Sequence, residues 1–325
     1  MNPPAVRLAA GAAAVELLPA VGGAIGAFTW HGAPVLRPTP PGVIAAQDVR
    51  LTSSYPLVPY SNRIRDARLR FGSHDYVLDR NFGDHPHSIH GVGWQREWTV
   101  DQAEETSALL RFEHDADAAN GAAWPWPFRA TQAFGLAAGN AHAVLTMSLA
   151  LCNSGSEAFP FGLGWHPFFP RTATTTVRFV ADDVWRNDAT ALPVERIDAV
   201  GAWTFAAARN PGAATIDNIF NGWDGTAVMD AADGSFTTTV EADAACDRLV
   251  VYAPSNRDFI ALEPVTHETD AFNRAHAGAR DTGMRVLPPG AAFSCTMRIT
   301  VASRPAEAGP TAALARGGTV GRASA

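Results

Sequence analysis

The feature that most constrains the fold is a period-two alternation of apolar and polar residues, which recurs along the 325-residue chain. Apolar side chains occupy every second position of residues 143–151, and residues 296–301 repeat the pattern near the end. Similar stretches bounded by Gly, Pro, Asn or Asp are residues 109–112, 174–180, 237–241 and 259–262. Alternation gives a strand one apolar and one solvated face, so it predicts many short antiparallel strands.

No stretch carries the pattern of a long amphipathic helix, and the 28 Gly and 23 Pro punctuate the apolar runs as turn residues. The sequence therefore predicts an all-β protein, a large antiparallel β-sandwich formed by one domain over residues 5–303. Residues 304–325 are mostly Ala, Gly, Arg, Ser and Thr. Such a segment buries too little apolar surface to offset its ordering entropy, so we expect a disordered tail.

Composition excludes several classes of function. A net charge of −7 argues against nucleic acid or an anionic membrane as a partner. All 25 basic residues are arginine, which excludes a Schiff-base lysine and a phosphate-loop lysine. The three cysteines are widely spaced, which indicates neither a disulfide framework nor a thiolate zinc site. With no signal-peptide pattern or apolar span at the start of the sequence, we expect a cytoplasmic protein.

Two residues could carry acid–base chemistry. His166 lies among aromatic residues and glycines in residues 161–169, and Glu263 ends an apolar stretch just before Pro264. A carboxylate at the end of a buried strand projects into whatever the mouth of the sheet encloses, and burial raises its pKa. The alternatives are a core histidine with its hydrogen bonds satisfied and an edge glutamate paired with an arginine. The residues alone leave both pairs of interpretations open.

Other polar and aromatic residues could bind a ligand rich in hydroxyl groups. The Arg63 guanidinium could hold vicinal hydroxyls, or it could form a surface ion pair, as we expect for Arg65, Arg68 and Arg70. Asp217 could accept hydroxyl hydrogen bonds or form a turn. Trp165, beside His166, could stack on a sugar face, although a core position is its alternative.

Three histidines, His85, His87 and His90, fall within six residues. Neutral imidazoles are good metal ligands, so the triplet permits a metal site. The alternative is a polar loop in which one or two histidines are functional. With no cysteine partner and no helical pair of histidines, we expect no metal, although incidental binding near His85 and His87 stays open.

Five segments resemble, in the same order along the chain, the aldose 1-epimerase (galactose mutarotase) family. The resemblance covers roughly residues 15–300. The segments are residues 17–26, an opening hairpin; residues 59–64, an Asn-Arg-Ile block; residues 87–91, a His-Gly block; residues 164–169, a His-Pro-Phe-Phe block; and residues 262–266, a Glu-Pro block. Two departures are Phe168, where tyrosine is common, and a single Gly91 followed by Val92, which leaves the sugar preference open.

The resemblance implies a galactose mutarotase-like supersandwich with an open groove. It implies that Glu263 is the general base, that His166 is the general acid and that His90 is a second active-site histidine. Arg63, its neighbour Asn62 and Asp217 would bind the sugar. The implied enzyme is a cofactor-independent isomerase of a free aldose, which acts as a monomer or a homodimer.

We expect an ionised Glu263 and a protonated His166 to face each other across a gap as wide as a pyranose ring. Three alternatives stay open. The first is a hexose-6-phosphate 1-epimerase that uses an arginine group such as Arg65, Arg68 and Arg70. The second is a non-catalytic sugar-binding or regulatory protein. The third is a metal-dependent enzyme that uses the three histidines of residues 85–90.

Overall fold

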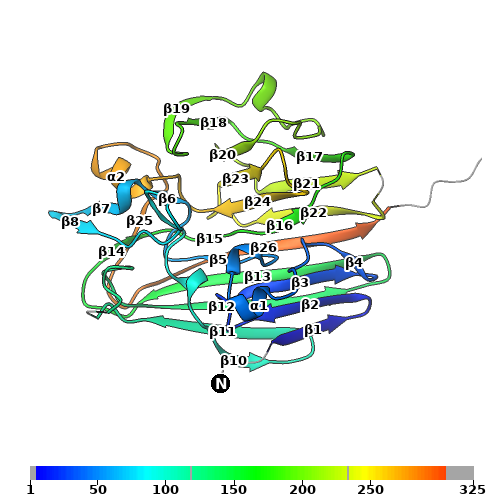
Figure 1. The fold of residues 1–325 in the computed structure, drawn as a ribbon, viewed down its shortest axis with the longest axis horizontal. Coiled ribbons are helices and arrows are strands. Elements are labelled where there is room, and N and C mark those ends of the chain that lie inside the picture. The colour runs from blue at the N-terminus through cyan, green and yellow to red at the C-terminus, as the bar shows by residue number, and fades with distance from the viewer. Residues whose placement is uncertain (1–4, 118, 233, 305–325) are drawn as a thin grey trace, which may run out of the picture.

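The computed structural model describes residues 5–117, 119–232 and 234–304 as antiparallel β-sheets with few helices (Figure 1). The predicted all-β sandwich is therefore confirmed. The predicted tail begins at Arg304, whose guanidinium bonds Asp230 and the carbonyl of Ala231. Residues 305–325, over which the tail was predicted to be disordered, lie outside the described residues.

The first eight-stranded sheet contains both stretches with the clearest alternation. Residues 143–151 lie in β13 and residues 296–301 in β26, and the two strands pair so that Met147 lies opposite Met297. Every second side chain of β13 is buried, as alternation requires. In spatial order the strands are β10 (Thr99–Ala103), β11 (Ser107–His114), β12 (Phe128–Ala138), β13 (His142–Asn153), β26 (Ala292–Ser303), β22 (Phe236–Ala242), β21 (Thr226–Ala231) and β17 (Thr175–Phe179).

The second large sheet has β24 as its most connected strand. On one side β24 pairs with β23, and on the other it pairs first with β16 and then with β15. In spatial order the strands are β19 (Pro193–Asp198), β18 (Asp183–Asn187), β20 (Ile216–Asn221), β23 (Arg248–Ala253), β24 (Phe259–Val265), β15 (Gly164–Trp165) and β5 (Pro56–Leu57), with β16 (Phe168–Pro170) also beside β24.

Smaller elements complete the molecule. A four-stranded sheet is formed by β1 (Val6–Ala10), β2 (Ala13–Leu18), β3 (Ala24–Trp30) and β4 (Ala33–Pro34). Three strand pairs are β6 (Arg63–Ile64) with β9 (Ser88–Ile89), β7 (Arg68–Phe71) with β8 (His74–Val77), and β14 (Phe159–Phe161) with β25 (Arg285–Leu287). The helices are α1 (Val43–Ala46), α2 (Ala271–His276) and the 3₁₀ turns η1 (Val49–Leu51), η2 (Arg65–Ala67), η3 (Gly93–Gln95) and η4 (Gly201–Trp203). Among the described residues, no helix is long and apolar enough to cross a membrane.

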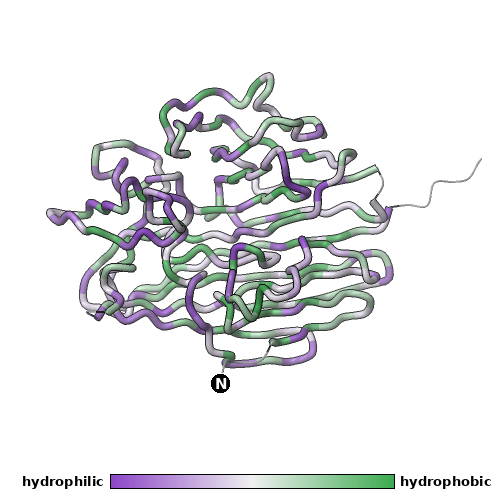
Figure 2. The backbone as a smooth tube through the Cα atoms, viewed as in Figure 1, coloured by the Kyte–Doolittle hydropathy of each residue, from purple (hydrophilic) through white to green (hydrophobic). Residues whose placement is uncertain are grey.

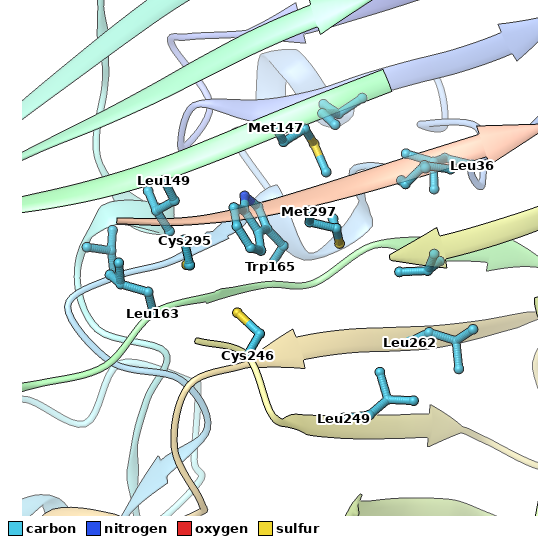
Figure 3. Close-up of a cluster of buried hydrophobic side chains, with 14 of the residues drawn as sticks. Leu36, Met147, Leu149, Leu163, Trp165, Cys246, Leu249, Leu262, Cys295 and Met297 are labelled. Atoms are coloured by element: carbon cyan, nitrogen blue, oxygen red, sulfur yellow. The ribbon is translucent and has the colours of Figure 1, made fainter. Parts of the chain in front are cut away.

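The hydrophobic core lies between the two large sheets. Met147 and Met297 from the first sheet face Leu249 and Leu262 from the second, and Trp165 lies among them (Figure 3). Hydrophobic and hydrophilic residues alternate along many of the strands (Figure 2). Because one face of β24 is committed to this core, its alternate residues are directed to the opposite face, where the candidate site lies.

Candidate active site

Strand pairing places Glu263 and His166 opposite each other. Gly164 pairs with Val265, and Phe168 pairs with Ala261, both antiparallel across β24. Continuing that register between β15 and β16 sets His166 against Glu263. Directly opposed residues in an antiparallel pair have neighbouring side chains on the same face, so the backbone itself brings these two groups together.

The two side chains are in direct contact, with His166 Nε2 lying 3.2 Å from Glu263 Oε1. The exposed fractions are 8% for the histidine side chain and 2% for the glutamate. Glu263 Oε2 is buried and has no hydrogen-bond partner among the described residues. The expected gap of a pyranose ring's width is thus absent. A cross-strand pair brings the groups to hydrogen-bond distance, and an incoming ligand would meet them as one unit.

Burial shifts the pKa values of the pair in opposite directions, in each case toward the neutral form of the group. Desolvation, together with the positive charges of Arg37 and Arg63, lowers the pKa of His166 to about 3. Desolvation and the nearby Asp217 raise the pKa of Glu263 well above its usual value, against the opposing effect of Arg63. Both shifts favour the neutral forms of the two groups, and they therefore oppose the expected ionised glutamate beside an imidazolium. Burial thus favours a proton on the carboxyl group over one on the imidazole.

His90 presents a hydrogen-bond donor to the same site. Its Nδ1 accepts a hydrogen bond from the backbone N–H of Asn62 at 3.0 Å, and the backbone N–H of His90 donates to the Asn62 carbonyl at 2.9 Å. Burial, with the positive charge of Arg63, lowers the pKa of His90 well below its usual value. A neutral ring that accepts at Nδ1 carries its proton on Nε2, so His90 offers an N–H group.

Arg63 is held by two neighbours that the sequence also singled out. Its Nη1 donates to Asn62 Oδ1 at 2.8 Å, and its Nη2 donates to Asp217 Oδ2 at 3.0 Å. Asn62 lies in the left-handed region at φ 59°, which asparagine tolerates better than most residues. Arg63, Asn62 and Asp217 therefore form one connected polar wall beside the acid–base pair. Arg63 Nε has no hydrogen-bond partner among the residues that the structure describes.

Trp165 does not take part in this site. Its side chain is 1% exposed and packs in the core between the sheets (Figure 3). Successive side chains of a strand point to opposite faces, so Trp165 must point away from the face that carries His166. The expectation that Trp165 binds the ligand is corrected on this geometry.

Aromatic side chains that the sequence analysis did not single out form the rest of the wall. Phe168 stacks on His166 with ring centroids 4.3 Å apart, and Tyr55 lies 4.8 Å from the same imidazole. Tyr252 and Phe259 come from β23 and β24. The resulting pocket of about 280 Å³ is lined by Arg37, Arg50, Leu51, Tyr55, Asn62, Arg63, Phe82, His85, Ile89, His90, His166, Phe168, Asp217, Val250, Tyr252, Arg257, Phe259 and Glu263.

The three histidines His85, His87 and His90 do not point toward a common centre. His85 and His87 have ring centroids 5.1 Å apart, whereas His90 turns toward His166 at 5.5 Å. His87 Nδ1 accepts the backbone amide of Asp66 instead. Among the described residues, no three His, Cys, Asp or Glu side chains are grouped closely enough to hold a metal ion.

Arg65, Arg68 and Arg70 line a different hollow, of about 490 Å³, together with Asp270 and residues of α2. Arg65 lies 3.6 Å from Asp270, and Arg70 lies 3.1 Å from Asp75, so these two arginines form the expected ion pairs. None of the three lines the pocket of the acid–base pair.

Comparison with known proteins extends these observations to a family. Residues 4–300 match the profile of the aldose 1-epimerase family. The uncharacterised protein YphB of Escherichia coli K12 is 29% identical over 288 residues, which cover 86% of this chain and 93% of YphB. A crystal structure from Escherichia coli K12, itself only provisionally assigned as an aldose 1-epimerase, has 26% identity and a TM-score of 0.82, with 93% and 99% of the two chains covered.

A galactose mutarotase-like protein from Clostridium acetobutylicum shares the fold, with 20% identity, a TM-score of 0.77 and coverage of 92% of this chain and 95% of that one. The β-sandwich of this chain is thus the fold of galactose mutarotase-like proteins. This chain belongs to the aldose 1-epimerase family, as the match over residues 4–300 shows.

Proposed function

We propose that this protein is an aldose 1-epimerase, a mutarotase that interconverts the α and β anomers of an aldose by opening and closing its ring. The observation that carries the proposal is the buried contact between Glu263 and His166. It lies inside a pocket that is also lined by hydrogen-bonding side chains, among them Arg63, His90 and Asp217. Membership of the family supports a sugar as the ligand.

Ring opening needs only two proton transfers. One group removes the proton of the anomeric hydroxyl, the other protonates the ring oxygen, the C1–O5 bond breaks and the C1 carbonyl forms. In our proposal the proton of the pair first crosses the 3.2 Å contact to His166. Glu263 then accepts the hydroxyl proton and His166 donates to the ring oxygen, which leaves both groups neutral, the state that burial favours.

Ring closure reverses these roles. The free aldehyde turns about the C1–C2 bond, the neutral imidazole removes the proton of the C5 hydroxyl as it attacks C1, and the carboxyl group returns a proton to the anomeric oxygen. The Nε2–H of His90 would donate to the sugar near the ring oxygen, while Arg63 and Asp217 would fix the remaining hydroxyls. Asn62 would act through Arg63 as a positioning residue. This chemistry requires no metal or cofactor.

Polarimetry of freshly dissolved α-anomers tests the proposal. Glucose, galactose, xylose and arabinose would be followed with and without protein, after subtraction of the spontaneous rate. We expect accelerated rotation change for at least one aldose, and the same acceleration in EDTA. A protein that binds these sugars without accelerating any of them would support the non-catalytic alternative, and loss of the rate in EDTA would support a metal enzyme.

A further inference from the structure

The pocket holds an arginine that has no carboxylate partner. The guanidinium carbon of Arg37 lies 3.8 Å from the ring centroid of Phe168 and 4.7 Å from that of Phe259. Its Nη2 donates to the backbone carbonyls of Arg50 and Thr52. Among the described residues, no carboxylate oxygen lies within 4.0 Å of the Arg37 guanidinium nitrogens, the limit for an ion pair. Aromatic faces and carbonyl groups hold this cation in place without neutralising it.

Leaving Arg37 in this state is unfavourable. Burial lowers the pKa of its guanidinium to about 10, despite the opposing effects of Tyr55 and Asp258. The Nε atom is buried and lacks a hydrogen-bond partner among the described residues. A desolvated cation without an ion-pair partner is stabilised when an anion binds beside it, and planar guanidinium groups match carboxylate and phosphate oxygens.

The charged residues that line the pocket also favour an anionic ligand. Of its four arginines, Arg63 is paired with Asp217 and Arg50 with Asp48. Arg37 and Arg257 remain without an ion-pair partner among the described residues. The chain as a whole carries a net charge of −7, so this excess of positive charge is local to the pocket.

Arg37 lies close to the reaction centre. Phe168 contacts its guanidinium and also stacks on the His166 imidazole at 4.3 Å, so a single aromatic ring links the two side chains. A group at the far end of one sugar residue could therefore reach Arg37 while its anomeric carbon lies at Glu263 and His166. The polar wall of Arg63 and Asp217 would remain free for the neutral hydroxyls.

We propose that the preferred substrate is an aldose with an anionic substituent, a carboxylate or a phosphate, and that Arg37 and Arg257 are the residues that select it. This inference rests on the proposed mutarotase function and names its substrate class. Arg37 and Arg257 thus take the role that the sequence analysis considered for Arg65, Arg68 and Arg70. Those three arginines line another hollow.

The test compares kcat/KM for glucuronate, glucose 6-phosphate and glucose, from polarimetry corrected for spontaneous mutarotation. Charge-assisted hydrogen bonds to one or two arginines predict a preference for an anionic sugar on the order of 10- to 100-fold over glucose. The two anionic sugars distinguish a carboxylate from a phosphate. The preference should shrink as ionic strength rises, because salt screens exposed charges such as that of Arg257.

Two variants locate the effect, and a third serves as the matched control. Arg37→Gln and Arg257→Gln should each reduce the ratio of kcat/KM for the anionic sugar to that for glucose by about tenfold. Arg68→Gln removes an arginine that lies outside the pocket and should leave the ratio unchanged. Because Arg257 is exposed, its variant keeps the test valid even if Arg37→Gln does not fold.

Equal or better turnover of glucose by the wild-type protein would overturn the inference while leaving the mutarotase function intact. A preference that survives in Arg257→Gln and in folded Arg37→Gln would overturn it as well. Failure to accelerate mutarotation of these three sugars and also of galactose, xylose and arabinose would instead remove the proposed function on which the inference depends.

Discussion

At the scale of single residues, each polar group of the site is set by one or two specific hydrogen bonds. Asn62 does this twice, because its amide fixes His90 Nδ1 and its side-chain oxygen fixes Arg63 Nη1. Its left-handed backbone places both groups toward the pocket. A short Asn-Arg sequence thereby orients two ligand-facing side chains, one in β6 and the other directly after β9.

Asn62→Gly tests this positioning role. Glycine adopts φ 59° without strain, so the variant removes the side-chain oxygen and leaves the turn unstrained. With one of its two partners lost, Arg63 is less well ordered, and we expect KM to rise by about tenfold while kcat changes less. Steady-state polarimetry separates the two parameters. A fall in kcat at constant KM would show that Asn62 does not act through substrate binding.

The pH profile of kcat/KM reports the protonation of the free pair. Below the pKa of His166, about 3, the pair carries two protons and can accept none. Above the raised pKa of Glu263 it carries no proton to donate. Activity should therefore be retained well below pH 6.5 and fall only toward pH 3, with an alkaline limb above the usual range of a glutamate. An acid limb at about 6.5 would contradict the buried, neutral His166.

At the scale of elements, the register between β15, β16 and β24 brings His166 to Glu263, and Gly164 maintains that register. A Cβ added at Gly164 would lie 2.8 Å from the carbonyl oxygen of Pro264 and 2.8 Å from Val265 Cγ1. The two strands can lie this close only because position 164 has no side chain.

Gly164→Ala should therefore force β15 away from β24 and separate the acid–base pair. We expect a loss of about 1–3 kcal/mol of unfolding free energy and at least a tenfold loss of activity. Gly135→Ala in β12 is the matched control, since its added Cβ meets no atom within 4 Å. Urea unfolding and polarimetry of both variants give the comparison. Unchanged activity in Gly164→Ala would contradict the claim that the spacing of β15 and β24 sets the catalytic geometry.

Much of this architecture could be predicted because it is local in the sequence. The alternation in residues 143–151 and 296–301 identified β13 and β26. Except for Trp165, the residues proposed for acid–base chemistry and for ligand binding lie in one pocket. Strand register is not local, so the 3.2 Å contact between His166 and Glu263 could not be foreseen. Arg37 follows a loop with no distinctive motif, and only the folded chain brings it to Phe168.

At the scale of the whole molecule, stability depends on buried histidines that the fold keeps neutral. His267 is an example: its Nε2 accepts the Ser61 amide at 3.0 Å, and its Nδ1 donates to the Glu268 carbonyl at 2.7 Å. Burial lowers its pKa to about 4. Protonation would break the hydrogen bond from the Ser61 amide. Between the two pKa values, His267 is therefore protonated in the unfolded chain and neutral in the folded chain.

The contribution of His267 is present above pH 6.5 and is lost as pH falls toward its folded pKa of about 4. Its full size is on the order of 3 kcal/mol. Urea midpoints should therefore decline from pH 7 to pH 4, and the decline should be shallower in His267→Gln. Glu263 acts in the opposite sense, because its raised pKa favours the folded state as pH falls. A midpoint independent of pH in this range would contradict the account.

The most direct test of the central claim is NMR exchange spectroscopy of equilibrated α- and β-aldose with wild-type protein, Glu263→Gln, His166→Gln and the double variant. Exposed Glu241→Gln is the control. If Glu263 and His166 work as one unit, exchange between anomers falls to the spontaneous rate in either single variant, and the double variant is no slower. Anomer exchange within a few-fold of wild type in a folded Glu263→Gln would contradict the account.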